Sequence, residues 1–142
     1  MTTCSDEDKK YIEISNLIKQ HRYNKALSVA NKAVIKYPKS IIALSRKGII
    51  LAKLKDYEAA LTIYETALKL DPVINTGLKL NSIILYKKGT MLENLHRYTD
   101  AIKCYDEYMK LSDTIPRIIA DIKKRKRKNE KMRKLSKTKH RT

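Results

Sequence analysis

The chain repeats itself with a period of 34 residues, and this repeat limits the possible folds more than any other feature. A shift of 34 residues superimposes several identical residues, among them Tyr23 and Tyr57, Ala26 and Ala60, Ala33 and Ala67, Pro38 and Pro72. A shift of 41 residues relates the second copy to a third: Gly48 and Gly89, Tyr57 and Tyr98, Ala60 and Ala101, Tyr64 and Tyr105. The seven additional residues, 75–81, form an insertion before the third copy.

The residues between these positions predict helices. Gly and Pro occur only three times each, so few residues interrupt long stretches rich in Lys, Leu, Ile and Ala. Ser40 and Asp56 are suitable N-caps, and Pro72 is expected to end a helix. The predicted helices cover residues 6–20, 24–37, 41–54, 57–70, 78–95 and 99–111, and a seventh begins near Pro116. The insertion either lengthens the fifth helix by about two turns or, as Asn75 and Gly77 favour, forms a loop.

The central copy resembles the tetratricopeptide repeat, a helix-turn-helix unit. It has the family's residue types at Leu44, Gly48, Leu51, Tyr57, Ala60, Tyr64, Ala67 and Pro72. The third copy keeps Leu85, Gly89, Leu92, Tyr98, Ala101 and Tyr105, with Tyr108 in place of a small residue and Asp113 in place of the final Pro. The first copy departs further: Lys10 occupies an apolar position, and Ile14 replaces the small residue at the helix crossing. This departure predicts an irregular first helix.

The resemblance implies an all-α fold, a right-handed superhelical stack of three tetratricopeptide hairpins plus a C-terminal capping helix that runs into a basic tail. Ile118, Ile119 and Ile122 give the seventh helix an apolar stripe suited to covering the third repeat. The predicted organisation is an N-terminal segment at 1–6, repeats over 7–113 (about 7–40, 41–74 and 82–113, with the insertion at 75–81), and the capping helix and tail at 114–142.

The sequence contains no pattern typical of an active site, a metal site or a cofactor site, so we expect no enzyme and no cofactor. His21 and His96 occupy equivalent turns between repeat helices, where a left-handed residue is often needed, and this explains both. Cys4 and Cys104 lie far apart and form neither a CxxC pair nor a disulfide framework. Without an apolar leader or membrane-spanning stretch, the chain is expected to be intracellular, in the cytoplasm, the nucleus or both.

The resemblance further implies a concave groove that binds a peptide or helix of a partner protein. Its positions in this chain are Tyr11, Ser15, Ser45, Arg46, Ile49, Lys53, Tyr86, Lys87, Thr90 and Asn94. Arg46 and Lys87 would favour an acidic or C-terminal peptide, although Lys and Arg are also common on any solvated helical surface. The family's clamp for chaperone tails is not predicted, because its positions hold Tyr11, Ser15, Arg46, Ile83 and Lys87.

Positive charge is concentrated at the C-terminal end. Residues 117–142 hold 13 Lys and Arg against 2 Asp and Glu, and the whole chain has a net charge of +17. The candidate basic-tail residues are Lys123, Lys124, Arg125, Lys126, Arg127, Lys128, Lys131, Arg133 and Lys134. Such a run is typical of a nuclear localisation signal or of non-specific contact with RNA or DNA phosphates, and less so of an acidic membrane surface. A solvated, partly disordered tail is the alternative.

Two functions follow from the sequence. In the first, the chain is a non-enzymatic adaptor or scaffold that binds a partner peptide in the groove, and the basic tail serves nuclear targeting or nucleic-acid association. In the alternative, the chain is an RNA- or DNA-associated factor in which the tail is the main binding element and the repeats dock it to an assembly.

Overall fold

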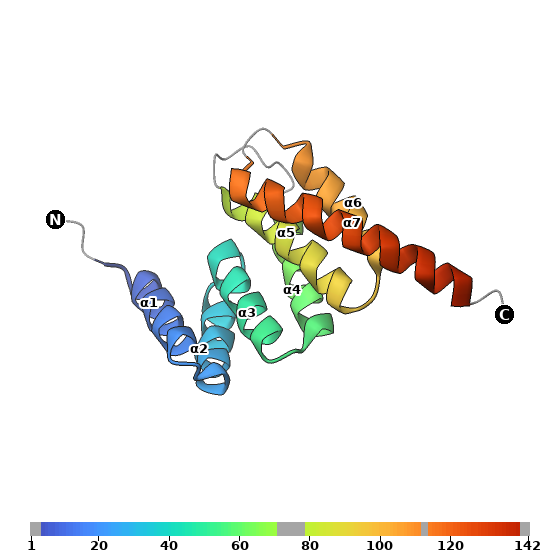
Figure 1. Cartoon of the computed structure of the whole chain (residues 1–142). Helices are drawn as coiled ribbons and strands as arrows, with labels where there is room; N and C mark the ends of the chain where they lie inside the picture. The colour runs from blue at the N-terminus through green and yellow to red at the C-terminus, as the bar shows by residue number, and fades with distance from the viewer. Residues whose placement is uncertain (1–3, 71–78, 112–113, 140–142) are drawn as a thin grey trace. The chain divides into compact units, whose positions relative to one another are not determined.

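The structure, a computed structural model, describes residues 4–70, 79–111 and 114–139 (Figure 1). This part of the chain is all-helical, without a β-strand. The helices are α1 Asp6–Lys19, α2 Tyr23–Lys36, α3 Ile41–Lys53, α4 Tyr57–Leu70, α5 Lys79–Asn94, α6 Tyr98–Met109 and α7 Pro116–Lys139. The predicted all-α fold and the predicted helix order are confirmed. The chain divides into two compact units, Met1–Pro72 and Val73–Thr142, which are described separately below.

The first unit contains two helical hairpins, α1 with α2 and α3 with α4, and α2 packs against α3. Side chains cap three of its four helices. The Ser5 hydroxyl accepts the Asp8 backbone N–H at 3.1 Å, and Ser40 accepts that of Ala43 at 3.2 Å. The Asp56 carboxylate accepts the Ala59 N–H at 3.3 Å. The caps predicted at Ser40 and Asp56 are therefore present, whereas Pro72 lies outside the described residues.

The turn inside each hairpin has the same backbone conformation. His21, Lys55 and His96 occupy equivalent positions and have φ values of 56°, 63° and 60°. In each turn the N–H one residue later donates back to the preceding helix, as Arg22 does to the Leu17 carbonyl at 2.9 Å. The His21 and His96 rings also hydrogen bond to the hydroxyls of Tyr23 and Tyr98. The left-handed turn role predicted for both histidines is confirmed.

The helix crossing at the centre of each hairpin pairs one large residue with one small residue. A Cβ atom on Gly48 would lie 2.4 Å from Tyr64, and one on Gly89 would lie 2.5 Å from Tyr105. In the first hairpin the equivalent positions hold Ile14 and Ala30, and both are fully buried in one cluster. The prediction of an irregular first helix is wrong, because Ala30 provides the space that Ile14 occupies and α1 is regular over its 14 residues.

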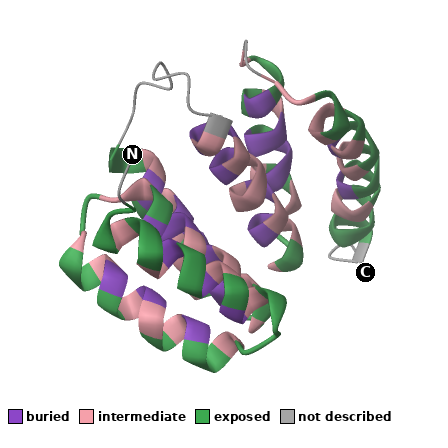
Figure 2. Cartoon of the chain, turned by 90° about the vertical axis from the view of Figure 1, so that its left-hand side faces the viewer, coloured by how far each residue is buried: buried purple, intermediate pink, exposed green. Residues whose placement is uncertain are grey.

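The second unit contains the hairpin of α5 and α6, and α7 packs against α6. Ile122 is fully buried, while Ile118 and Ile119 are half-buried, so the predicted apolar stripe faces the unit. Colouring by burial shows that most of α7 is otherwise exposed (Figure 2). The helix continues through the cationic run to Lys139, so the run is helical and the alternative of a partly disordered tail is wrong for these residues. Of the insertion, residues 79–81 begin α5, and residues 75–78 lie outside the described residues.

Candidate functional site

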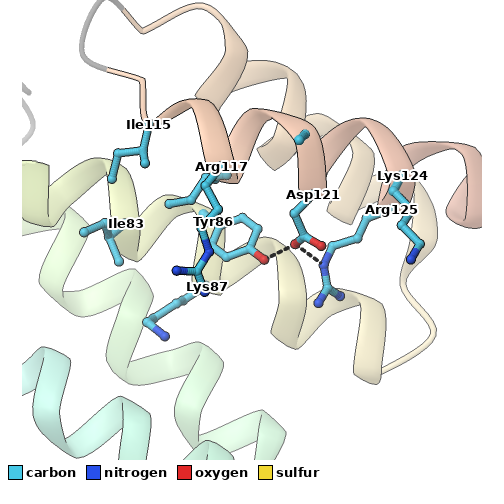
Figure 3. Close-up of a pocket in the computed structure, with 10 residues that line it drawn as sticks. Ile83, Tyr86, Lys87, Ile115, Arg117, Asp121, Lys124 and Arg125 are labelled. Atoms are coloured by element: carbon cyan, nitrogen blue, oxygen red, sulfur yellow. Dashed lines mark hydrogen bonds and ion pairs between the residues drawn. The ribbon is translucent and has the colours of Figure 1, made fainter.

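A cleft of about 740 Å³ lies between α5 and α7 within the second unit (Figure 3). Two residues of the predicted groove, Tyr86 and Lys87, contribute to it from α5. The other residues that line it are Ile83, Ile115, Arg117, Ile118, Ala120, Asp121, Lys124 and Arg125. Arg117, Asp121 and Lys124 follow one another at helical spacing, so they share one side of α7. The cleft therefore depends on α7 as much as on a repeat helix.

Positive charge predominates around this cleft. Four cationic side chains line it, from Lys87, Arg117, Lys124 and Arg125, against the single carboxylate of Asp121. Tyr86 donates its hydroxyl hydrogen bond to Asp121, and the Arg125 Nε–H donates to the same carboxylate at 2.6 Å. Burial alone would raise the pKa of Asp121, but these two donors and nearby positive charge hold that pKa below its usual value. Asp121 is thus occupied within the protein, and the exposed cations Arg117 and Lys124 leave the site suited to an anion.

The same cleft has an apolar part. Ile83 contributes from α5. Ile115, the residue before α7, and Ile118, in the first turn of α7, contribute from the other side. Ile83, Ile115 and Ile118 are half-buried, so their side chains remain partly accessible at the cleft. Apolar lining beside a few polar or charged groups is typical of ligand-binding clefts.

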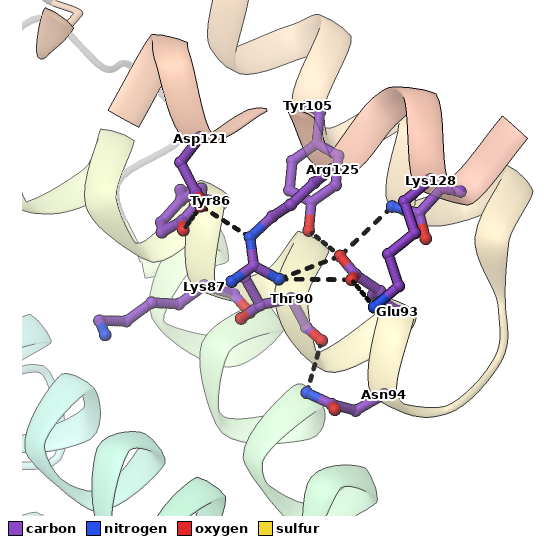
Figure 4. Close-up of polar contacts among 10 residues, drawn as sticks. Tyr86, Lys87, Thr90, Glu93, Asn94, Tyr105, Asp121, Arg125 and Lys128 are labelled. Atoms are coloured by element: carbon purple, nitrogen blue, oxygen red, sulfur yellow. Dashed lines mark hydrogen bonds and ion pairs between the residues drawn. The ribbon is translucent and has the colours of Figure 1, made fainter. Parts of the chain in front are cut away.

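A mostly buried carboxylate, that of Glu93, connects α5 to both α6 and α7 (Figure 4). It accepts the Tyr105 hydroxyl at 2.8 Å, Arg125 Nη1 at 3.3 Å and Asn129 Nδ2 at 3.3 Å. Burial raises the pKa of Tyr105, and its bond to the Glu93 carboxylate raises that pKa further, so the hydroxyl stays a donor. The Glu93 side chain is only 11% exposed, which makes these charge-assisted bonds strong. They fix the rotation of α7 relative to the hairpin.

The predicted groove residues of the first unit differ in their accessibility. Tyr11 is buried, its hydroxyl bonds to Glu7 and Ser40, and burial together with Glu7 raises its pKa to about 12. Ser45 is buried as well. Lys53 is exposed. The other three, Ser15, Arg46 and Ile49, are half-buried. On α3, helical spacing puts Arg46, Ile49 and Lys53 on one face.

Two predicted groove residues of α5 do not line the cleft. The Thr90 hydroxyl donates to the Lys87 carbonyl at 2.7 Å, and Asn94 Nδ2 donates to the Thr90 carbonyl at 2.9 Å. Both side chains therefore bond to their own helix. Sequence reasoning missed Ile115, Arg117 and Asp121, because the segment that carries them was interpreted only as a cap. The spacing of Arg117, Asp121 and Lys124 was the signal available for this face.

The candidate basic-tail residues fall into two sets. Arg125 bonds to Asp121 and Glu93, and Lys126 forms an ion pair with Asp106. Arg133 is half-buried. The exposed set comprises Lys123, Lys124, Arg127, Lys128, Lys131 and Lys134. Of these, Lys128 lies 4.0 Å from Glu93.

Within residues 4–70, 79–111 and 114–139, no three His, Cys, Asp or Glu side chains gather into a possible metal site. No helix in the same ranges is both long enough and apolar enough to span a membrane. Cys4 is an exposed thiol and Cys104 is a buried one.

The tetratricopeptide repeat family model matches residues 41–72, which include α3 and α4. Comparison with curated proteins gives no match. Among solved structures, the tetratricopeptide domain of Sgt2 from Aspergillus fumigatus is 20% identical, with a TM-score of 0.76 over 91% of this chain and 82% of that one. The TPR2B domain of yeast Sti1, in a complex with an Hsp70 peptide, is 15% identical, with a TM-score of 0.75 over 88% and 96%.

A third similar structure is the first tetratricopeptide domain of Spaghetti (RPAP3), bound to the HSP90 peptide SRMEEVD. It is 14% identical, with a TM-score of 0.73 over 89% of this chain and 94% of that one. These likenesses concern the fold. The matched model identifies one tetratricopeptide repeat at residues 41–72, and the solved structures show that the chain shares the fold of tetratricopeptide domains.

Proposed function

We propose that the protein is an adaptor that binds an acidic segment of a partner protein in the cleft between α5 and α7. The observation that carries this proposal is the combination of exposed cations, Arg117 and Lys124, with the apolar side chains of Ile83 and Ile118 in one cleft. A partner segment would place carboxylates against the cations and an apolar side chain between the isoleucines.

The similar structures support a peptide as the ligand. The Sti1 and RPAP3 domains hold peptides of Hsp70 and HSP90, and the HSP90 peptide SRMEEVD is acidic and contains Val and Met. The chaperone clamp itself does not fit this chain, because Tyr11 and Ile83 stand at two of its positions. Tyr11 is buried and hydrogen bonded, and Ile83 offers only an apolar surface. We therefore expect an acidic peptide other than a chaperone tail. On α3, Arg46, Ile49 and Lys53 remain candidates for further contact.

The test is affinity purification of the full chain from a lysate with nuclease, at low and high salt, followed by mass spectrometry. The cleft variant is Arg117→Glu with Lys124→Glu, and the matched control is Lys25→Glu with Lys32→Glu on exposed positions of α2. A direct partner should be retained by the wild type and the control and lost by the cleft variant. The peptide SRMEEVD, measured by fluorescence anisotropy, should bind weakly or not at all. Equal partner retention by the two variants would contradict the proposal.

A second candidate function uses the exposed cations of α7 for nuclear targeting or for association with nucleic acid. It is favoured by the exposure of Lys123, Arg127 and Lys131 along a helix that is anchored from its opposite side. This function does not depend on the cleft, and a chain that fails to capture a peptide could still perform it.

A further inference from the structure

The outer side of α7 carries a continuous row of cations, here named the outer ridge: Lys123, Arg127, Lys131 and Lys134. All four are exposed. Their spacing of four, four and three residues confines them to an arc of about 80° at 100° per residue. The row extends over about 16 Å at 1.5 Å per residue. Within the described parts of the chain, none of the four is held in an ion pair.

The helix is held in place by other residues. Ile122 and Asn129 are both fully buried, and Arg125 is bound to Asp121 and Glu93. Because Arg125 and Arg127 are about 160° apart around the helix, anchoring the first directs the second outward. The outer ridge is therefore presented by a preformed helix, and its backbone need not be ordered on binding.

We propose that the outer ridge binds the phosphate backbone of nucleic acid, in a manner independent of base sequence. This inference deepens the second proposed function and rests on it. A duplex carries closely spaced phosphates, about one per 1.7 Å of axis, so a straight row of cations some 16 Å long meets several of them at once. The ridge itself has no aromatic side chain for stacking on a base and carries only Lys and Arg in one row along the helix, so we expect its contacts to go mainly to phosphate.

Two other uses of the run fit the structure less well. An import receptor that reads a linear cationic signal in extended form would have to melt the helix and expose Ile122 and Asn129. A membrane surface would favour apolar side chains between the cations, because amphipathic helices bind by inserting their apolar side. Between Lys123 and Lys134 the only exposed residue besides the cations is the carboxylate Glu130, and the nearest exposed apolar side chain is that of Leu135, just beyond the end of the ridge. Glu130 lowers the local charge but leaves the row of cations uninterrupted in space.

The experiment measures binding of the full chain to labelled 20-base-pair DNA and RNA duplexes of two unrelated sequences, by fluorescence anisotropy between 50 and 200 mM KCl. The ridge variant is Arg127→Gln, Lys131→Gln and Lys134→Gln. The control is Lys9→Gln, Lys25→Gln and Lys32→Gln, three exposed cations of the first unit, with the same change of net charge. Circular dichroism establishes that both variants keep their helix content.

Four phosphate contacts predict a slope of log affinity against log salt near −3.6 for DNA, which is about a 100-fold loss across this range. The ridge variant should reduce that slope by about 2.7, since each lost contact removes about 0.9. The control should leave it within about 0.5 of the wild type. Separate titrations with the DNA and the RNA duplexes distinguish binding to the two kinds of nucleic acid. Within each kind, the two unrelated sequences should bind equally.

Three results would overturn the inference. One is an equal loss of affinity in the ridge variant and the control, which would make total charge the cause. Another is binding only to vesicles containing phosphatidylserine, sensitive to the same ridge variant, which would keep a role for the cationic face but assign it to membranes. The last is no binding to either duplex at 50 mM KCl. If the run still directs a fluorescent fusion to the nucleus, the second proposed function survives without this inference; if it does not, both fail.

Discussion

Two sides of one helix, α7, use the same kinds of residue for opposite purposes. On the inner side, Arg125 bonds to Asp121 and Glu93, and Ile122 and Asn129 are fully buried. On the outer side, Arg127 and Lys131 are exposed. The run of cations is therefore not one functional unit: the pitch of the helix divides it into a half that holds the fold and a half that remains available for a ligand.

The largest expected effect comes from removing the apolar anchor of the inner side. Ile122→Ala should lower the free energy of unfolding by about 3 kcal/mol, because it leaves a cavity at a fully buried site. The neighbouring outer substitution Lys123→Ala should change it by less than about 0.5 kcal/mol. Urea denaturation followed by circular dichroism provides the measurement. Similar losses for the two variants would mean that α7 has no distinct inner side.

The next effect concerns the mostly buried carboxylate of Glu93. Glu93→Ala should cost about 2 kcal/mol, since it leaves Tyr105, Arg125 and Asn129 without their shared acceptor. Glu130→Ala, on the exposed side of α7, is the matched carboxylate and should have little effect. Thermal unfolding of the two variants distinguishes them, and partial recovery in Glu93→Gln would identify the lost hydrogen bonds as the cause.

A sharper comparison exchanges one arginine for the other. Arg125→Gln should destabilise the fold by about 1 kcal/mol, a value reduced for the partial exposure of the side chain. Arg127→Gln should leave stability unchanged and weaken duplex binding. Stability and DNA affinity are both measured for each variant. The division of the run is wrong if Arg125→Gln weakens binding more than Arg127→Gln while both remain folded.

The smallest effect is a dependence of the stability of the fold on pH. The pKa of Asp121 is lowered in the folded chain, so its interactions stabilise the fold fully above the unfolded value of 3.8 and are lost as pH falls below it toward the folded pKa. Thermal unfolding of the wild type should therefore lose more stability between pH 5 and pH 3 than that of Asp121→Asn. Parallel losses in the two proteins would show that Asp121 does not contribute to this acid sensitivity.

Much of the fold could be predicted from the sequence, because the repeat places the same small residues at the same helix crossings. Gly48 and Gly89 are required by Tyr64 and Tyr105, and all four are visible in the alignment of copies. The prediction of an irregular first helix was wrong because Ile14 was considered without Ala30, the residue at the same helix crossing. Ala30 is equivalent to Tyr64. The pair of Ile14 and Ala30 combines one large and one small residue, as the pair of Gly48 and Tyr64 does, so the total volume at the crossing is similar.

The candidate site was less accessible to sequence reasoning. Arg125 and Arg127 stand in one uninterrupted run of six cations, and nothing local distinguishes them. Their separation depends on the rotation of α7, which is fixed by Glu93 and Tyr86 from another helix. The cleft depends on the same rotation, since it brings Arg117 and Lys124 beside Ile83. Such long-range packing leaves no short pattern in the sequence.

The measurement that tests this account most directly is amide hydrogen exchange of the full chain, followed by mass spectrometry of peptides that cover residues 120–132. If α7 is an anchored helix through the cationic run, its amides should exchange at least about 100-fold more slowly than those of an unstructured peptide of the same sequence. The inner anchor Ile122→Ala should accelerate them, and Lys123→Ala should not. Exchange at the unstructured rate in the wild type would contradict the account, because a solvated tail has neither an inner nor an outer side.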